Sequence, residues 1–131
     1  MNTKKYLIAA ITSSIVMVLL AGLWHKIIMV AFYTAETHAK HEGTGIIFLA
    51  YFVLSLIMAY LYPFYFQGKS SLLEGLKFGL LIGLLWVFPH ELAMAGAHGT
   101  SISYVLKNGL WHLVEQGVGG MVLGFVYGKI G

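Results

Sequence analysis

Residues 75–83 read GLKFGLLIG and residues 120–128 read GMVLGFVYG. In both stretches glycine recurs every four residues, which places the three glycines on one face of a helix as a flat groove. Such grooves let two helix backbones approach closely inside a membrane. We therefore expect these two helices to pack against each other in antiparallel orientation, with Gly75 level with Gly128.

The composition around these repeats is typical of an integral membrane protein. Of the 131 residues, 59% are hydrophobic and 10% are charged. Four apolar runs reach the roughly 20 residues needed to cross about 30 Å of hydrocarbon. The first run exceeds the apolar region of a signal peptide, about 7 to 15 residues, so we expect it to be a span. The expected fold is an all-α integral membrane four-helix bundle, one transmembrane domain with helices at about 6–33, 45–66, 72–95 and 103–127.

The charged residues indicate an orientation and exclude some functions. The formal net charge is +3 and all positive side chains are lysines, without the dense basic cluster typical of nucleic-acid binding. There is no Cys, which excludes disulfides and thiolate metal sites. A cytoplasmic N-terminus would put most lysines on the cytoplasmic side, as the positive-inside rule requires. We expect a multi-pass inner (plasma) membrane protein with both termini in the cytoplasm. The lysines on that side are Lys4, Lys5, Lys69, Lys77 and Lys129.

Four ionisable residues fall in the outer halves of the third and fourth expected helices. They are His90, Glu91, His112 and Glu115. Ionisable groups inside a span are costly, and they commonly mark a functional site. Extending the glycine faces outward brings these side chains to a shared depth. Pro89 removes a backbone hydrogen bond there and would open the third helix. We therefore expect an outward-facing polar pocket in which these four residues are metal ligands.

A short internal sequence repeat adds the first expected helix to this pocket. The sequence GLWH occurs at 22–25 and again at 109–112. In both the first and the third expected helix a histidine precedes a methionine by four residues, which puts the pair on one helical face. Imidazole with thioether suits Cu(I) or haem, whereas imidazole with carboxylate suits Zn or Fe. Core packing of the methionines is the alternative interpretation. The additional candidate cofactor ligands are His25, Met29 and Met94.

Two further histidine-bearing segments lie outside the expected spans. Residues 34–42 read TAETHAKHE, a loop dense in imidazole and carboxylate that would collect a cation at the pocket mouth. A solvated loop is the alternative interpretation. We expect His98 on a loop surface.

Other short motifs run along the chain. They are Trp24, Phe32-Tyr33, Leu61-Tyr62-Pro63, Glu91-Leu92 and Asn108-x-x-Trp111. In these motifs the chain resembles a group of small four-helix bacterial inner-membrane proteins catalogued only as domains of unknown function. That group tends to carry acidic residues where this sequence has Ala21 and Asn108. The resemblance covers nearly the whole chain; it implies a four-helix bundle and no particular activity.

Two classes of function fit these features. In the first, the outer pocket binds or passes a small cation, a metal such as Cu, Zn or Fe, or a haem-like cofactor, with Glu91 and Glu115 compensating charge or carrying protons. In the second, the protein is a non-catalytic accessory or scaffold subunit that packs through its glycine grooves against a second copy or a larger membrane complex. An enzyme ranks behind both, because no nucleophile motif, HExxH or phosphate-binding loop is present. The expected surroundings are the lipid bilayer, and no nucleic acid is expected.

Overall fold

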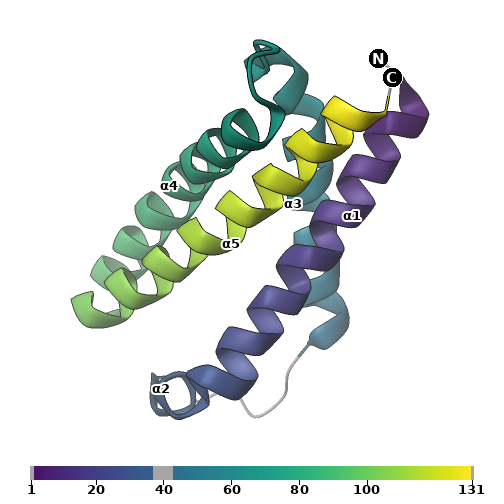
Figure 1. Ribbon diagram of the computed structural model, residues 1–131. Helices are drawn as coiled ribbons and strands as arrows, with labels where there is room; N and C mark the ends of the chain where they lie inside the picture. The colour runs from purple at the N-terminus through teal and green to yellow at the C-terminus, as the bar shows by residue number, and fades with distance from the viewer. Residues whose placement is uncertain (1, 37–42, 131) are drawn as a thin grey trace.

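The computed structural model describes residues 2–36 and 43–130, and every regular element in these ranges is helical. The two termini lie at one end of the molecule and α2 lies at the other (Figure 1). We call these the terminal end and the α2 end. The all-α class expected from the sequence is therefore confirmed. The elements in chain order are α1 (Thr3–Leu23), the π-helix η1 (Trp24–Ile28), α2 (Val30–Glu36), α3 (Thr44–Tyr65), α4 (Ser71–His98) and α5 (Ile102–Lys129).

In the described part of the chain, three helical segments are long and apolar enough to cross a membrane. They are Thr3–Ile28, Thr44–Tyr65 and Ser71–His98. Helix α5 is as long as α4 at 28 residues, but it is less apolar. Its position explains the difference, because α5 packs against α4, α1 and α3. A helix covered by its neighbours does not need an apolar surface all round, and α5 buries Asn108, Glu115 and Gln116.

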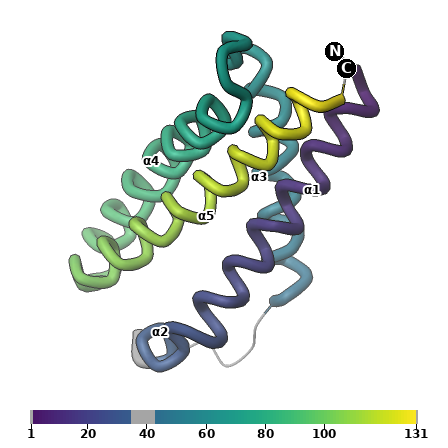
Figure 2. The backbone as a smooth tube through the Cα atoms, viewed as in Figure 1, coloured from purple at the N-terminus to yellow at the C-terminus, as the bar shows by residue number. Residues whose placement is uncertain are grey.

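Helices α4 and α5 form a tight antiparallel hairpin (Figure 2). A methyl group at Gly79 would overlap the carbonyl group of Gln116, and one at Gly120 would overlap the carbonyl group of Gly75. Only glycine permits backbones to approach this closely. The two glycine grooves therefore face each other within a single chain.

The register of this hairpin differs from the expected one. Gly75 lies against Gly120 and Gly124 instead of level with Gly128. The expectation placed glycines directly opposite one another, whereas in the structure Gly75 packs between Gly120 and Gly124, and Gly79 packs against Gln116 and Gly117. Relative to the expected register, α5 is therefore displaced along α4 by at least one helical turn, about 5.4 Å. All contacts toward the α2 end are displaced with it.

The first expected helix, 6–33, is broken near its end. The backbone N–H of Met29 bonds to the carbonyl oxygen of Trp24 five residues earlier, which makes η1 a π-helix. Met29 itself leaves the helical conformation, with φ −115° and ψ 26°. Figure 1 shows that α2 consequently runs in a different direction from α1. Hydropathy alone does not reveal this break, because the sequence stays largely apolar through Tyr33.

At the terminal end, aromatic side chains fill the space between α3, α4 and α5. Tyr62 is fully buried, and its ring contacts those of Phe78 and Tyr127 at 5.4 and 5.3 Å between centroids. The Tyr62 hydroxyl donates to the Ser71 carbonyl oxygen at 3.1 Å, and the Tyr127 hydroxyl donates to that of Ala59 at 2.7 Å. This end of the bundle is closed by rings whose polar atoms are satisfied.

Candidate functional site

Glu115 lies at the centre of a buried polar cluster, and its side chain has no exposed surface. The indole Nε1 of Trp111 donates to its Oε2 at 3.1 Å, and the amide Nε2 of Gln116 donates to its Oε1 at 3.1 Å. The Tyr51 side chain of α3 also interacts with this carboxylate. All three neighbours present hydrogen-bond donors, and donors stabilise a carboxylate that carries negative charge.

His112 is the nearest titratable neighbour of Glu115. Its Nδ1 lies 3.4 Å from Oε1 of Glu115, one turn further along α5. That nitrogen is buried and has no hydrogen-bond partner. On its other side the imidazole meets the Trp86 ring of α4 edge to face, with 5.4 Å between centroids. The pair becomes an ion pair whenever His112 carries a proton and Glu115 does not.

The two GLWH segments meet in the structure. Trp24 stacks on Trp111 with ring centroids 4.3 Å apart and planes inclined by 5°, and the His25 ring lies 6.4 Å from the His112 ring. Nδ1 of His25 is 2.9 Å from the carbonyl oxygen of Ala21. Since a carbonyl can only accept, Nδ1 carries the hydrogen and Nε2 is the basic nitrogen of the neutral ring. The repeat of the GLWH sequence thus brings another imidazole, that of His25, beside His112.

A chain of hydrogen bonds connects this cluster to α4. Nε1 of Trp24 donates to the Tyr33 hydroxyl at 3.0 Å, and that hydroxyl donates to Oδ1 of Asn108 at 2.8 Å. Nδ2 of Asn108 donates in turn to Oε1 of Glu91 at 3.1 Å. The amide of Asn108 also interacts with the His25 side chain. Asn108, which is only 4% exposed, therefore joins η1, α2 and α4.

Three of the expected ligands lie away from this cluster. His90 and Met94 are exposed on α4, and Met29 is half-buried at the break after η1. The hairpin register explains the position of His90, because the ring of Phe88 packs against Gly109. This part of α4 is consequently level with the beginning of α5 and not with His112 and Glu115.

The expected four-residue metal centre is not formed. Glu91 binds Asn108 and His90 is exposed, while His112 and Glu115 lie deeper in the bundle. Within residues 2–36 and 43–130, no three histidine or carboxylate side chains are arranged to hold a metal ion. Ligation would require their nitrogen and oxygen atoms within about 2.0 to 2.2 Å of a single ion. The displaced register keeps the α4 and α5 groups apart, so a metal ion shared by these four residues is not supported.

Three further sequence expectations concern Pro89, His98 and the histidine-rich stretch 34–42. Helix α4 continues through Pro89 to His98, so the proline does not open it, and His98 is an exposed residue in the last turn of α4. Gly99, with φ +71°, ends the helix. Of the histidine-rich stretch 34–42, residues 37–42 fall outside the described residues.

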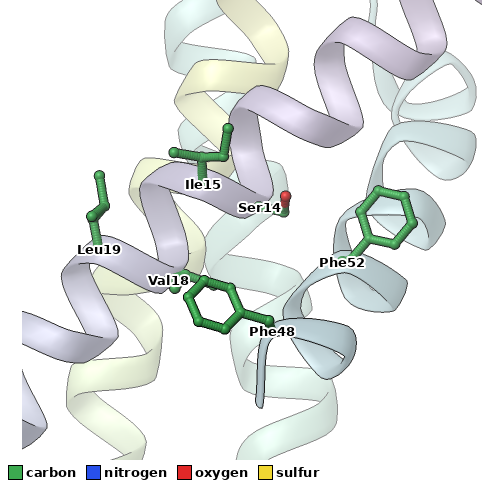
Figure 3. A pocket seen from close by; sticks show the side chains of 6 residues that line it. All are labelled: Ser14, Ile15, Val18, Leu19, Phe48 and Phe52. Atoms are coloured by element: carbon green, nitrogen blue, oxygen red, sulfur yellow. The ribbon is translucent and has the colours of Figure 1, made fainter. Parts of the chain in front are cut away.

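An apolar groove lies on another face, between α1 and α3 (Figure 3). Its volume is about 280 Å³ and it has no ionisable side chain in its lining. The hydroxyl of Ser14, its one polar side chain, already donates to the carbonyl oxygen of Ile11 at 2.9 Å. The groove is therefore not a candidate cation site. Its lining residues are Ser14, Ile15, Val18, Leu19, Phe48 and Phe52.

Sequence reasoning did not assign several members of the polar cluster to the site. Asn108 and Gln116 had a usable signal, because an amide inside an expected span must find hydrogen-bond partners. Tyr51 had none, since it is one of many aromatic residues on α3 and only the packing of α3 against α5 brings it to Glu115. The other unassigned members are Trp24, Tyr33 and Trp111.

Comparisons with family models, with curated proteins and with solved structures found no match to this chain.

Proposed function

We propose that this is a multi-pass membrane protein that binds or passes a small cation at Glu115. The four long helices form a bundle in the bilayer, in which the three apolar spans shield the more polar α5. Lysines gather near the terminal end, so the positive-inside rule puts that end in the cytoplasm and the α2 end outside the plasma membrane. These lysines are Lys4, Lys5, Lys69, Lys77 and Lys129.

The observation that carries the proposal is the complete burial of Glu115, with an imidazole nitrogen of His112 at 3.4 Å. Ionisable groups within a span are costly, face the interior of the bundle and commonly mark ion pathways or proton relays. Glu115 and His112 have these properties. A second imidazole, that of His25, lies beside them and offers a further site for positive charge.

The accessory-subunit alternative draws less support from the packing. That alternative depends mainly on the pair of glycine grooves as a binding surface for a partner. Contact between α4 and α5 already occupies these grooves. A partner would have to bind elsewhere on the surface. A side chain that only bridges helices also does not need to be ionisable, because a glutamine at position 115 could accept the same hydrogen bond from Trp111.

Purified protein reconstituted in liposomes tests the proposal. The wild type should bind or pass cations, and Glu115→Gln should lose this activity because it keeps the shape of the side chain but not the charge. An interaction with a charged group is worth about 1.5 to 3 kcal/mol, so the loss should be at least about tenfold.

Glu74→Gln is the matched control. It makes the same chemical change at a half-buried carboxylate outside the polar cluster, whose oxygens accept from the backbone N–H groups of Gln67 and Lys69 at 2.9 and 3.1 Å. This control should behave as the wild type. Equal activity of Glu115→Gln and wild type, or a wild type that binds and passes no cation, would contradict the proposal. Stoichiometric Cu, Zn, Fe or haem in the purified protein would indicate a metal instead of a simple cation.

A further inference from the structure

We infer that the terminal end of the protein binds anionic phospholipids through their phosphate groups. This inference rests on the bundle lying in a bilayer, as proposed above, but not on a cation at Glu115. Three features carry it: the lysines of this end, the lack of ion-pair partners for them among the described residues, and aromatic side chains that set their depth. We call these lysines the basic rim. They are Lys4, Lys5, Lys69, Lys77 and Lys129.

The basic rim is built from several elements. Lys4 and Lys5 lie in the first turn of α1, and Lys129 is the last residue of α5. Figure 1 shows these two helix ends near each other, and Nζ of Lys5 lies 5.1 Å from the centre of the Tyr127 ring of α5. The other two lysines belong to α4 and to the loop before it. The rim is thus contributed by both sides of the terminal end.

The charge of the basic rim is not neutralised within the described residues. Glu74 is the one carboxylate that these residues place at the terminal end, and its oxygens accept from the backbone N–H groups of Gln67 and Lys69 at 2.9 and 3.1 Å. In residues 2–36 and 43–130, no carboxylate forms an ion pair with a lysine of the rim. The rim therefore presents positive charge to its surroundings. Its exposed members are Lys4, Lys69, Lys77 and Lys129.

Among the described residues, the α2 end has a balanced set of charges. There Lys26 and Lys107 are matched in number by Glu36 and Glu91. Nζ of Lys107 also lies 4.8 Å from the centre of the Phe32 ring, a contact that holds it against α2. The excess positive charge is therefore at the terminal end, and attraction to an anionic membrane surface acts there.

Aromatic side chains on α3 mark the level of the bilayer surface. Tyr60 and Phe64 lie one turn apart with ring centroids separated by 5.7 Å, and 53% and 78% of their surfaces are exposed. Exposed rings of this kind gather where hydrocarbon meets the headgroups. Helix α3 ends at Tyr65, and Lys69 follows four residues later. Lys77 starts deeper, on α4, but its flexible stem reaches the same level. The basic rim therefore lies at the depth of the phosphates.

An anionic phospholipid complements both the rim and the surface below it. Its phosphate carries negative charge at the level of the ammonium groups, and its acyl chains contact the exposed leucines beneath them. A zwitterionic phospholipid offers the same chains, but its own cationic headgroup offsets the attraction to the lysines. Charge therefore decides between the two lipids. The leucines are Leu7 on α1 and Leu72 and Leu73 on α4.

Native mass spectrometry of the purified protein tests this inference, with phosphatidylglycerol and phosphatidylcholine of identical acyl chains as probes. One lysine near an anionic lipid favours binding about fivefold. With two or more lysines at each side of the rim, the wild type should bind phosphatidylglycerol at least about tenfold more tightly than phosphatidylcholine. Lys4→Gln/Lys69→Gln/Lys77→Gln/Lys129→Gln should bind the two lipids with affinities within about twofold. These four side chains are exposed, so the variant should fold.

Two controls separate charge from other effects of the substitutions. The same four positions changed from Lys to Arg should keep the preference, because arginine retains the charge and binds phosphate. Lys26→Gln/Lys107→Gln should also keep it, since this variant removes lysines from the α2 end. Raising the ammonium acetate concentration from about 0.1 to 1 M shortens the screening length from about 10 to about 3 Å, and this should weaken the preference of the wild type.

The possible results distinguish this inference from the proposed function. Equal affinity of the wild type for the two lipids would overturn the inference and leave the cation site at Glu115 standing. A preference for phosphatidylglycerol that persists in the glutamine variant would have the same meaning. A wild type that binds neither lipid would instead contradict the placement of the bundle in a bilayer, on which both proposals depend.

Discussion

The two halves of the bundle are built on opposite principles. In the terminal half, backbones of α4 and α5 touch across glycines, and the Tyr62 ring fills the remaining space with its hydroxyl satisfied. In the α2 half, the helices are joined by polar side chains around Glu115 and Asn108, and two buried polar atoms there, Nδ1 of His112 and Oε1 of Gln116, have no hydrogen-bond partner. The comparison teaches that close packing fixes the register in one half and thereby decides which polar groups meet in the other.

The largest loss of stability is expected from a substitution that disrupts the glycine packing in the terminal half. Gly79→Leu places a side chain where even a methyl group overlaps the Gln116 carbonyl. The hairpin would have to separate, and we expect a loss of unfolding free energy of about 3 kcal/mol or more, measured by denaturant unfolding in detergent. Gly96→Ala on the same helix is the control, because a Cβ there meets nothing within 4 Å. Equal stability of Gly79→Leu and wild type would show that the glycine contact does not hold the hairpin.

A smaller loss of stability is expected from removing the Glu115 side chain at the centre of the polar half. Glu115→Ala leaves the donors of Trp111 and Gln116 unpaired and creates a cavity, which together should lower the unfolding free energy by about 2 to 4 kcal/mol. The same unfolding measurement checks this value. A variant more stable than the wild type would mean that the carboxylate is held at a net cost and that its hydrogen bonds contribute little.

Removing the hydrogen bonds that bridge α2 and α4 through Asn108 should have the smallest effect on stability. Asn108→Ala removes the acceptor for Tyr33 and the donor for Glu91, so a loss of about 1 to 3 kcal/mol is expected, with Tyr33→Phe losing about 1 kcal/mol. Hydrogen exchange should accelerate in the amides of α2 and remain unchanged in those of α3. Uniform acceleration over both helices would show that Asn108 supports the whole bundle instead of the attachment of α2.

The sequence contained much of the fold and part of the cluster. Apolar length gives the long helices, because crossing a hydrocarbon layer requires a minimum number of residues. The proximity of His112 and Glu115 follows from their i, i+3 spacing on one helix. The break at Met29 leaves no trace in hydropathy, since it depends on contacts that Tyr33 makes only in the folded chain.

The remaining site could not be derived, because it depends on the hairpin register. Equal four-residue repeats on both helices allow several alignments that differ by one turn, and spacing alone does not choose among them. The alignment decides whether Glu91 meets Glu115 or Asn108. The partner from α3, Tyr51, requires knowledge of how a third helix packs.

The most direct measurement of the central claim is an infrared titration of wild type beside Glu115→Gln in the same lipid. If Glu115 is the group that binds the cation, the infrared bands of its carboxylate change when the cation binds to the wild type, and this change is missing from the variant. If both proteins give the same change, or neither does, Glu115 is a structural side chain and the assignment of a cation site is wrong.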